Sequence, residues 1–535
     1  MYLYDYPIGA PVPVEAQENV LPNSLSVPEK LTVYFERQRW LLLAFVSLLY
    51  FAGTIALAAT RPLWYDEIFT AYLARLGSTA QLWAALSEAT DVTPPLFNLI
   101  TRESVSLFGP TELALRLPEV IGFWVMGLCV FAFVYKRSSI LYAIAAFLVP
   151  ICVDAGMYAS EARPYGLVLG GCGAALVCWQ TAADGQRRVL AITGLALSLA
   201  AATSVQYYGA LFVIPLALGE IVRTRQRRAV DWLIFAAFLA APIALLLHLP
   251  WIRIAMTYSG GEWSAINFEA LVSTYSGMLG KYTPVAFAGL FLAVGTALMN
   301  RTKGYSIFPA APARETAAIA GMILLPAAAI VVAFLTNGIF AFRYALPSII
   351  GFAAAIYIFP LRNARQTATL GLGYFVIFTG TFAVLEVWHL RHFFVRHEPS
   401  KAARLARVLE GYHQAIAIAD PHQYLELAYY APSELHSRLY YIASPLNARR
   451  LIHFDDDDRS LLLLRKWAPL HVSEYEPFLS ENSRFLLYGR PNEGWLLPKC
   501  LEEQVPVQAG KLVGENMLML VDGRTPPAVG GSSDN

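Results

Sequence analysis

The sequence predicts a polytopic α-helical membrane protein that ends in a small extracytoplasmic α/β domain. Hydrophobic residues occupy 56% of the 535 positions and charged residues only 15%, below the share of about 25% in soluble domains. Apolar runs recur throughout residues 39–390, many of them close to the roughly 20 residues that cross a bilayer. Residues 391–535 return to a soluble composition. These observations together predict a membrane domain followed by a water-exposed one.

About eleven membrane spans are expected. The first, residues 40–60, follows a polar segment, residues 1–38, that lacks the basic-then-apolar layout of a cleavable signal. It should therefore remain as a signal anchor with the amino terminus in the cytoplasm. The later candidates are centred on residues 120–135, 140–156, 165–180, 190–203, 208–222, 232–250, 284–299, 317–336, 344–360 and 368–388.

Basic residues are concentrated in alternate loops, and short cytoplasmic loops are the ones that retain Lys and Arg. These loops contain Lys136, Arg137, Arg187, Arg188, Arg223, Arg225, Arg227, Arg228, Arg301, Lys303, Arg314, Arg362 and Arg365. The loops between them hold only isolated basic residues. The alternation predicts an odd number of spans, with the amino terminus inside and the carboxyl-terminal segment outside. The expected location is a bacterial-type inner or plasma membrane.

Two regions on the outer side are large. The loop 61–119, which we assign to the membrane domain, contains amphipathic stretches at 66–76 and 95–108. Arg102 and Glu103 make a lipid-facing span costly in the second stretch, at about 2.5–3.5 kcal/mol per central charge. Helices lying in the interface are therefore expected. The tail 391–535 alternates short apolar runs with helix-like segments, and its last dozen residues have the composition of a disordered end.

Composition excludes several classes of site. The net charge of +1 indicates no nucleic-acid partner. Four of the five cysteines lie in apolar runs, so neither a disulfide framework nor a Cys-based metal site is indicated. Residues 455–458 are four consecutive aspartates, which we interpret as a solvated loop because adjacent carboxylates cannot all face one ion without a shaped loop. No cofactor is predicted, and a need for a divalent metal is left open.

Two adjacent carboxylates, Asp66 and Glu67, follow the first span at the outer boundary of the membrane. One interpretation is catalytic, because a carboxylate at this place can accept the proton of a hydroxyl group. The alternative is structural: Asp66 caps a helix that begins at Glu67. Position alone favours neither.

Basic residues recur where spans meet the outer face, against their general depletion there. They are Arg163, with Glu161 two residues before it, Lys281 and Arg343. Arg suits a bidentate grip on phosphate, and cations stabilise charge that develops on a leaving phosphate. The alternative for each is snorkelling, or pairing with a carboxylate such as Glu161. Recurrence on one face favours a shared function.

An aromatic group accompanies these residues. Gln206, Tyr207 and Tyr208 lie at an outer span end, with Trp251 and Tyr258 further along the chain. They suit stacking on a sugar or a polyprenyl chain. An interfacial aromatic belt is the alternative.

An ordered set of short motifs resembles the GT-C membrane glycosyltransferases, in the branch of the protein O-mannosyltransferases and the lipid A aminoarabinose transferases. The motifs are LWYDE at 63–67, TPPL at 93–96, ELALRLP at 112–118, EARPY at 161–165 and RY at 343–344. The resemblance covers about residues 40–390. Each motif alone is weak, but their order is specific.

The resemblance implies a cavity, roofed by the first outer loop, that admits a polyprenyl-phosphate sugar from the membrane and an acceptor from water. Asp66 matches the acidic position that activates the acceptor, with Glu67 beside it as a helper. Basic positions tied to the donor phosphate, or to holding the loop, match Arg116, Arg163 and Arg343. Tyr165 and Tyr344 accompany these arginines as cavity-lining residues.

The chain departs from that branch at two places. Relatives often carry His before the Tyr–Tyr pair, where this chain has Gln206, so the resemblance implies no titrating group there. They also often show Lys or His before the Pro–Pro pair, which Asp91, Val92 and Thr93 precede here. Asp91, Gln206 and Tyr207 are retained as contacts for the acceptor or sugar, without a substrate identity.

The expected activity is transfer of a hexosyl or pentosyl group from a polyprenyl-phosphate sugar to a protein, lipid or glycan acceptor, with inversion. A transporter or flippase of lipid-linked sugars would use the same basic residues, but it predicts broken spans in matching halves, and no convincing internal repeat is found. A ligase of lipid-linked glycans is a further alternative. In a membrane scaffold, substitution of Asp66 would leave function intact.

Overall fold

The structure is a computed structural model that describes residues 25–258, 268–291, 311–336, 339–358, 364–395, 401–490, 493–513 and 516–522. The expected disordered end and most of the N-terminal segment lie outside these residues. The chain divides into two compact units. We call residues 1–60, 93–250 and 265–396 the helical unit, and residues 61–92, 251–264 and 397–535 the α/β unit.

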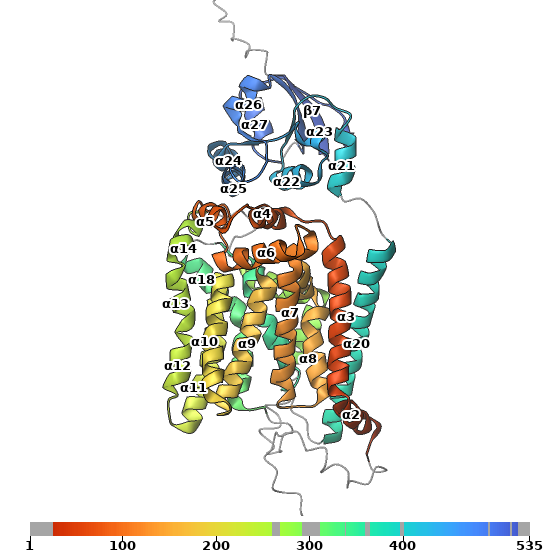
Figure 1. Cartoon of the computed structure of the whole chain (residues 1–535), viewed down its shortest axis with the longest axis vertical. Coiled ribbons are helices and arrows are strands. Elements are labelled where there is room, and N and C mark those ends of the chain that lie inside the picture. The colour runs from red at the N-terminus through yellow and green to blue at the C-terminus, as the bar shows by residue number, and fades with distance from the viewer. Residues whose placement is uncertain are drawn as a thin grey trace, which may run out of the picture. The chain divides into compact units, whose positions relative to one another are not determined.

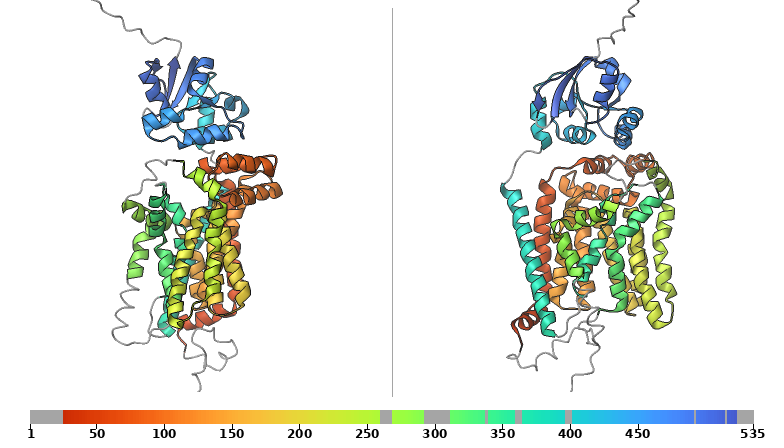
Figure 2. Two further views of the ribbon diagram at one scale, coloured as in Figure 1. Left: turned by 90° about the vertical axis from the view of Figure 1, so that its left-hand side faces the viewer. Right: turned by 180° about the vertical axis from the view of Figure 1, so that it is seen from behind.

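The helical unit consists of long apolar helices that stand side by side (Figures 1 and 2). Among the described residues, five are long and apolar enough to cross a membrane. They are α3 (Arg39–Thr60), α7 (Glu112–Tyr135), α9 (Tyr165–Ala183), α10 (Arg188–Val205) and α20 (Ala364–Val395). The predicted multi-pass membrane protein is confirmed.

Three further combinations of helices are long and apolar enough only when they are taken together, and each is bent by more than 40° at a short break, as in a broken span or a re-entrant loop. They are α8 (Ile140–Cys152) with the 3₁₀ segment η1 (Asp154–Ser160), α12 (Trp232–Phe238) and α13 (Ala240–Leu247) with α14 (Leu249–Ala255), and α17 (Ala313–Ile323) with α18 (Leu325–Leu335). Two other predicted spans are shorter helices, α11 (Val213–Arg227) and α19 (Ser348–Ala355). The span predicted at 284–299 extends beyond the described residues.

Shorter helices also belong to the helical unit. Those with described bounds include α2 (Val27–Arg37), α6 (Pro95–Phe108) and α15 (Phe268–Leu279). Helix α6 runs across the ends of neighbouring spans instead of alongside them (Figure 1), as expected for an interfacial helix. Pro94 and Pro95 at its start fit a helix N-terminus, where a missing N–H leaves no bond unmade.

Helices α7 and α9 approach closely because glycines face one another. A Cβ atom on Gly122 would lie 2.6 Å from the carbonyl carbon of Gly166, and one on Gly170 would lie 2.7 Å from the oxygen of Gly122. A Cβ on Gly166 would overlap the carbonyl of Glu119. Gly166 and Gly170 are four residues apart, the spacing that lets membrane helices pack backbone to backbone.

At the other end of α7 and α9, the carboxylates of Asp184 and Glu315 form ion pairs with predicted cytoplasmic basic residues. Arg137 donates to Asp184 at 2.8 Å and to Glu315 at 2.7 Å, and Lys136 lies 2.6 Å from Asp184. Tyr357 also donates to Glu315 at 2.8 Å. The cluster ties together the ends of α7, α9 and α17. Of the predicted cytoplasmic basic residues, Arg301, Lys303 and Arg362 lie outside the described chain.

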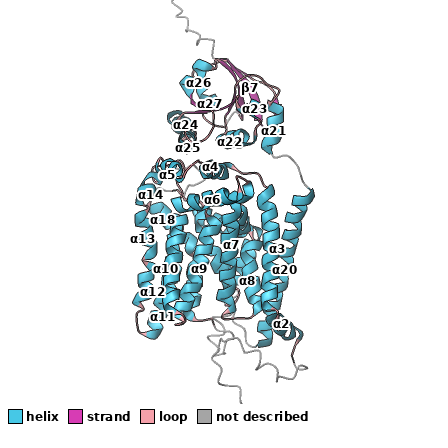
Figure 3. Cartoon of the chain, in the orientation of Figure 1, coloured by secondary structure: helices cyan, strands magenta, loops and turns pink. Residues whose placement is uncertain are grey.

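The α/β unit contains a sheet with the strand order β3–β2–β1–β4–β7–β5, in which β6 pairs with β7. Its parallel part is formed by β1 (Ile416–Ile418), β2 (Leu439–Ala443), β3 (Val472–Glu474) and β4 (Arg484–Gly489). The antiparallel part is formed by β5 (Val507–Gln508), β6 (Leu512–Val513) and β7 (Asn516–Asp522). Figure 3 shows the strands in this unit. The predicted C-terminal α/β domain is confirmed.

Helices connect the strands of this sheet. They are α22 (Pro421–Tyr430), α23 (Ser433–His436), α24 (Pro445–Ile452), α25 (Asp456–Leu464), α26 (Tyr475–Glu481) and α27 (Leu496–Glu502), and α21 (Lys401–Leu409) precedes β1. The chain passes from β1 outward to β2 and β3, and then returns to place β4 on the other side of β1. The connection therefore changes direction between β1 and β4, as in doubly wound sheets.

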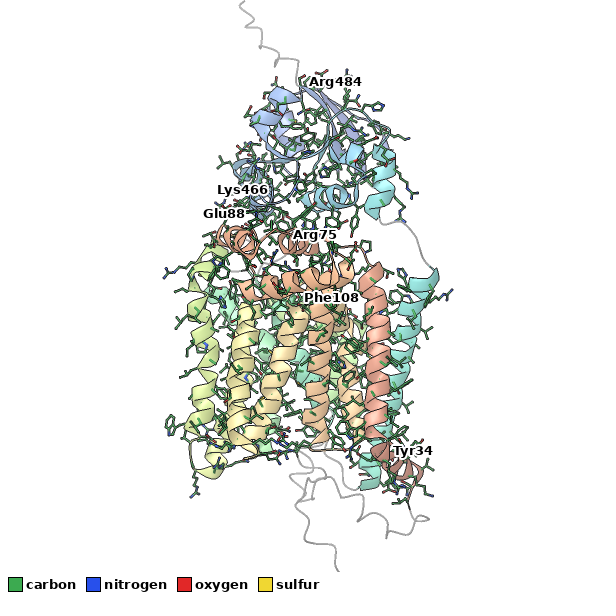
Figure 4. The ribbon with its side chains drawn as sticks, viewed as in Figure 1. Tyr34, Arg75, Glu88, Phe108, Lys466 and Arg484 are labelled. Carbon is green, nitrogen blue, oxygen red and sulfur yellow. The ribbon has the colours of Figure 1, made fainter. Side chains whose placement is uncertain are left out.

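Two helices from the first loop belong to the α/β unit: α4 (Tyr65–Ala74) and α5 (Thr79–Ser87). The guanidinium of Arg75 lies 5.2 Å from the ring centre of Tyr429, and Lys466 forms a 3.0 Å ion pair with Glu88 (Figure 4). The structure thus groups residues 61–92 with the C-terminal residues and places the rest of the loop, from Thr93, in the helical unit.

The glycine contact predicts a sharp difference between two substitutions. Gly166→Ala should destabilise the helical unit by about 1–3 kcal/mol, because its methyl group meets backbone that no side-chain rotation can move. Gly373→Ala in α20 is the matched control, since nothing lies within 4 Å of its Cβ position. Thermal unfolding in detergent should show a lower midpoint for the first variant only. Equal midpoints would contradict the close packing of α7 on α9.

Candidate functional site

The acidic pair lies in the first turn of α4. This helix begins at Tyr65 with Trp64 as its N-cap, so Asp66 is inside the helix and does not cap it. Glu67 is fully buried, accepts a hydrogen bond from the backbone N–H of Trp64 at 3.3 Å and lies 3.5 Å from Arg61. Glu67 therefore closes the first turn. Asp66 is only half-buried.

The residue before Asp66 is held by the C-terminal part of the same unit. The ring of Tyr65 stacks on His422 with centroids 4.1 Å apart and an interplanar angle of 7°. Its hydroxyl donates to Asp457 at 3.1 Å, and Asp457 lies 3.8 Å from Nε2 of His422. Leu63 donates its backbone N–H to the hydroxyl of Tyr430 at 2.7 Å. The start of α4 is thus fixed by contacts with α22 and α25.

Three of the four predicted basic residues of the helical unit, all but Arg116, lie on or beside segments where regular α-helix is interrupted. Besides η1, the described residues include the 3₁₀ segments η2 (Tyr207–Phe212), η4 (Gly280–Tyr282) and η5 (Phe342–Ala345). Arg163 lies just after η1, Lys281 lies in η4, and Arg343 lies in η5.

These interrupted segments contact one another through aromatic side chains. Tyr158 of η1 packs edge-on against Tyr165 at 4.9 Å and against Phe342 at 6.3 Å, so the segment that bears Arg163 adjoins the segment that bears Arg343. Tyr208 of η2 stacks on Tyr344 of η5 at 4.6 Å. The structure therefore brings three of the predicted segments together within the helical unit.

The segment that bears Lys281 contacts η1 through the neighbouring residue Gly280. A Cβ atom on Gly280 would overlap the carboxylate of Asp154, so the backbone beside Lys281 passes directly against η1. Gly280 has a φ of +55°, a conformation that favours glycine. The Lys281 side chain is exposed, and its ammonium lies 5.2 Å from the ring centre of Tyr282.

The remaining predicted residues have diverse surroundings. In the helical unit, Glu161, Tyr165 and Gln206 are buried. Arg116 is also fully buried, and one of its guanidinium nitrogens donates to the carbonyl of Ala58 at 2.7 Å. This bond joins α7 to the end of α3. Asp91 is buried and, like Asp66 and Glu67, belongs to the α/β unit.

Glu119 of α7 is a buried carboxylate beside the candidate site that the sequence analysis did not identify. It is fully buried and accepts hydrogen bonds from the backbone N–H groups of Gly166 and, at 2.9 Å, Leu167. These groups lie in the first turn of α9, where they lack partners within the helix. Glu119 therefore fixes the segment that contains Arg163. The sequence does contain one sign of its importance, because a carboxylate is rare within an apolar span.

The interpretation of residues 455–458 as a solvated loop is wrong. Helix α25 begins at Asp456, and Asp458 in its first turn is buried. Its carboxylate accepts hydrogen bonds from the backbone N–H of Ser444 at 2.6 Å, from Tyr441 at 3.0 Å and from Trp495 at 3.0 Å. Aspartates favour the first turn of a helix because its N–H groups carry partial positive charge. The four leucines at 461–464 were the overlooked signal for this helix.

Metal ligands do not gather in the described part of the chain. No group of three or more His, Cys, Asp or Glu side chains there is arranged to hold a metal ion.

Comparison with solved structures identifies the fold. The chain resembles ArnT from Cupriavidus metallidurans in the apo state, with a TM-score of 0.55 and 13% identity over 90% of this chain and 97% of that chain. The ArnT structure bound to undecaprenyl phosphate gives a TM-score of 0.53 with the same identity and coverage. The expected GT-C-like fold is confirmed. No protein-family model matches the chain, and a search of curated proteins finds no match.

Burial raises the pKa of Asp458 to about 6, against three hydrogen bonds that lower it. The unfolded carboxyl has an ordinary pKa of about 3.9, so the folded unit binds this proton more tightly. The resulting stabilisation is present below about pH 4 and is lost as the pH rises through about 6.

Asp458→Asn should remove this dependence. The free energy of unfolding of the wild type, relative to that of the variant, should fall by about 2–3 kcal/mol between pH 4 and pH 7. Urea unfolding of the full chain, followed by hydrogen exchange over residues 439–500, measures the difference. Parallel pH profiles would show that Asp458 keeps an ordinary pKa.

Proposed function

We propose that this chain is a membrane glycosyltransferase that takes a sugar from a polyprenyl-phosphate donor and transfers it to an acceptor on the extracytoplasmic face. The convergence of η1, η2 and η5, with η4 against η1, carries this proposal. Breaks in regular α-helix within a membrane protein are tolerated where the interrupted backbone is buried in protein or lines a water-filled cavity. Basic residues at such a place mark a site for an anionic group.

The anionic group in this proposal is the donor phosphate. Arg163 and Arg343 grip its oxygens, and Lys281 adds a third positive charge. As the bond between the sugar and the phosphate breaks, negative charge grows on the departing polyprenyl phosphate, and fixed cations stabilise that charge. The ArnT structure with bound undecaprenyl phosphate supports a ligand of this class on this fold.

The aromatic contacts have a supporting role in this proposal. Tyr165 packs against Tyr158, and Tyr344 stacks on Tyr208, which holds the segments bearing the two arginines in fixed positions. Pre-organised cations stabilise charge without a cost of rearrangement during the reaction. Arg116 holds α7 to α3, and Gln206, Tyr207 and Asp91 are proposed contacts for the sugar or acceptor.

Asp66 is the proposed base. The acceptor oxygen attacks the anomeric carbon of the sugar, its proton passes to Asp66, and the polyprenyl phosphate leaves from the opposite side, which inverts the configuration. Glu67 helps by fixing the first turn of α4 through Trp64 and Arg61. We place the amino terminus in the cytoplasm and the α/β unit outside, in keeping with the distribution of Lys and Arg.

Asp66→Asn should lower kcat by about 10²-fold or more while the KM for the donor changes little, because only the proton acceptor is lost. Transfer is measured with purified protein in nanodiscs, a panel of undecaprenyl-phosphate sugars and membrane extract as acceptor.

Arg343→Lys keeps the positive charge but loses the bidentate grip on phosphate, so its transfer activity in the same assay should fall between those of Arg343→Ala and wild type.

The same panel separates the alternatives. A flippase would move the donor across the bilayer without consuming it, and Asp66→Asn would leave that movement intact. A ligase of glycan chains would ignore donors that carry a single sugar and accept longer lipid-linked glycans. Either result would contradict the proposed reaction.

A further inference from the structure

We infer that the α/β unit positions the proposed base through a clamp formed by Tyr65, His422 and Asp457. His422 and Asp457 are then positioning residues for sugar transfer, although they lie more than 350 positions from Asp66 in the sequence. This inference rests on the proposed function of Asp66 and deepens it.

The clamp lies at the edge of the sheet where doubly wound domains ordinarily bind a ligand, which is the carboxyl end of the parallel strands. His422 is in the first turn of α22, directly after β1, and Asp420 caps this turn by accepting the N–H groups of His422 and Gln423. Asp457 is in the first turn of α25. Its neighbour Asp458 accepts the N–H of Ser444, which directly follows β2.

Tyr65 occupies this edge in the manner of a bound ligand. Its ring is buried and lies parallel to the His422 ring, and its hydroxyl donates to Asp457. Helix α22 also contacts α4 beyond this edge: Tyr430 accepts the N–H of Leu63, and Tyr429 packs against Tyr72 at 5.7 Å. A side chain of the first loop thus fills the place of a small molecule.

The clamp fixes the orientation of the first turn of α4. Tyr65 and Asp66 are consecutive, so a rotation that releases Tyr65 from His422 also turns the Asp66 side chain away. Displacement of a catalytic group by about 1 Å can cost about 10²-fold in rate. The donor phosphate is assigned to Arg163 and Arg343 of the helical unit, so loosening the clamp should act on kcat and leave the KM for the donor nearly unchanged.

The decisive variants alter one contact at a time in the full chain in nanodiscs. Asp457→Leu removes the acceptor for the Tyr65 hydroxyl at similar size, and kcat should fall by roughly 10- to 100-fold with undecaprenyl-phosphate sugar as donor. Asp457→Asn retains an acceptor oxygen and should recover most of the activity. Tyr65→Phe keeps the stacking and loses only the hydroxyl, so it should lower kcat in the same direction without threatening the fold.

Hydrogen exchange provides a readout that does not depend on catalysis. In Asp457→Leu and Tyr65→Phe, amides of residues 63–75 should exchange faster, whereas those of α6 in the helical unit should not change. Lys466→Ala is the matched control, because it removes the exposed ion pair with Glu88 from the same unit. Exposed pairs contribute little, so this variant should keep kcat within about twofold.

The possible failures are distinguishable. Wild-type kcat together with wild-type exchange in Asp457→Leu and Tyr65→Phe would overturn the clamp. Faster exchange with unchanged kcat would overturn its role in transfer. An equal loss of kcat in Lys466→Ala would also overturn it. If Asp66→Asn transfers sugar as well as wild type, the proposed function of Asp66 fails, and exchange over residues 63–75 alone decides whether the clamp exists.

Discussion

Inside a bilayer no water is present to pair with a backbone N–H or C=O group, and the helical unit is organised by this constraint. Its long helices satisfy their own backbone. Where the helices break, the interrupted segments pack against one another, and a buried side chain accepts hydrogen bonds from backbone N–H groups that lack a partner within their own helix. Glu119 does so for the start of α9, beside Arg163. The same arrangement therefore brings together the segments that bear Arg163 and Arg343.

Carboxylates that accept backbone N–H groups recur at the start of helices in the α/β unit, as Glu119 does at the start of α9 in the helical unit. Glu67 closes the first turn of α4, Asp420 caps α22, and Asp458 binds the N–H that follows β2. Such acceptors fix the direction in which a helix leaves the preceding segment. The proposed base Asp66 is thus held in place by Glu67, an acidic residue whose carboxylate binds the backbone instead of a substrate.

The membrane fold was predictable because apolar runs of sufficient length have few alternatives in water, and the α/β domain because its composition changes abruptly after residue 390. The residue types of the site were predictable from their unusual places, such as Arg163 at a span end. Their partners were not. Glu119 binds the N–H groups of residues 47 and 48 positions later, and Asp458 accepts hydrogen bonds from Tyr441 and Trp495, which lie 17 and 37 positions away in the sequence. A single sequence also gives no sign that residues 61–92 pack with the C-terminal domain, because spacing reports neighbours along a helix and not contacts between distant segments.

The grouping of the first loop with the C-terminal residues has a consequence for synthesis. His422 lies 357 positions after Tyr65, so at about 5–20 residues per second the ribosome needs roughly 20–70 s to supply the partner of α4. During that interval most of the spans are made while the aromatic side chains of α4 have no sheet to pack on. Final assembly of the α/β unit is therefore among the last steps of biogenesis, and a chain truncated before β1 would insert its membrane helices and still lack the surface that receives Tyr65.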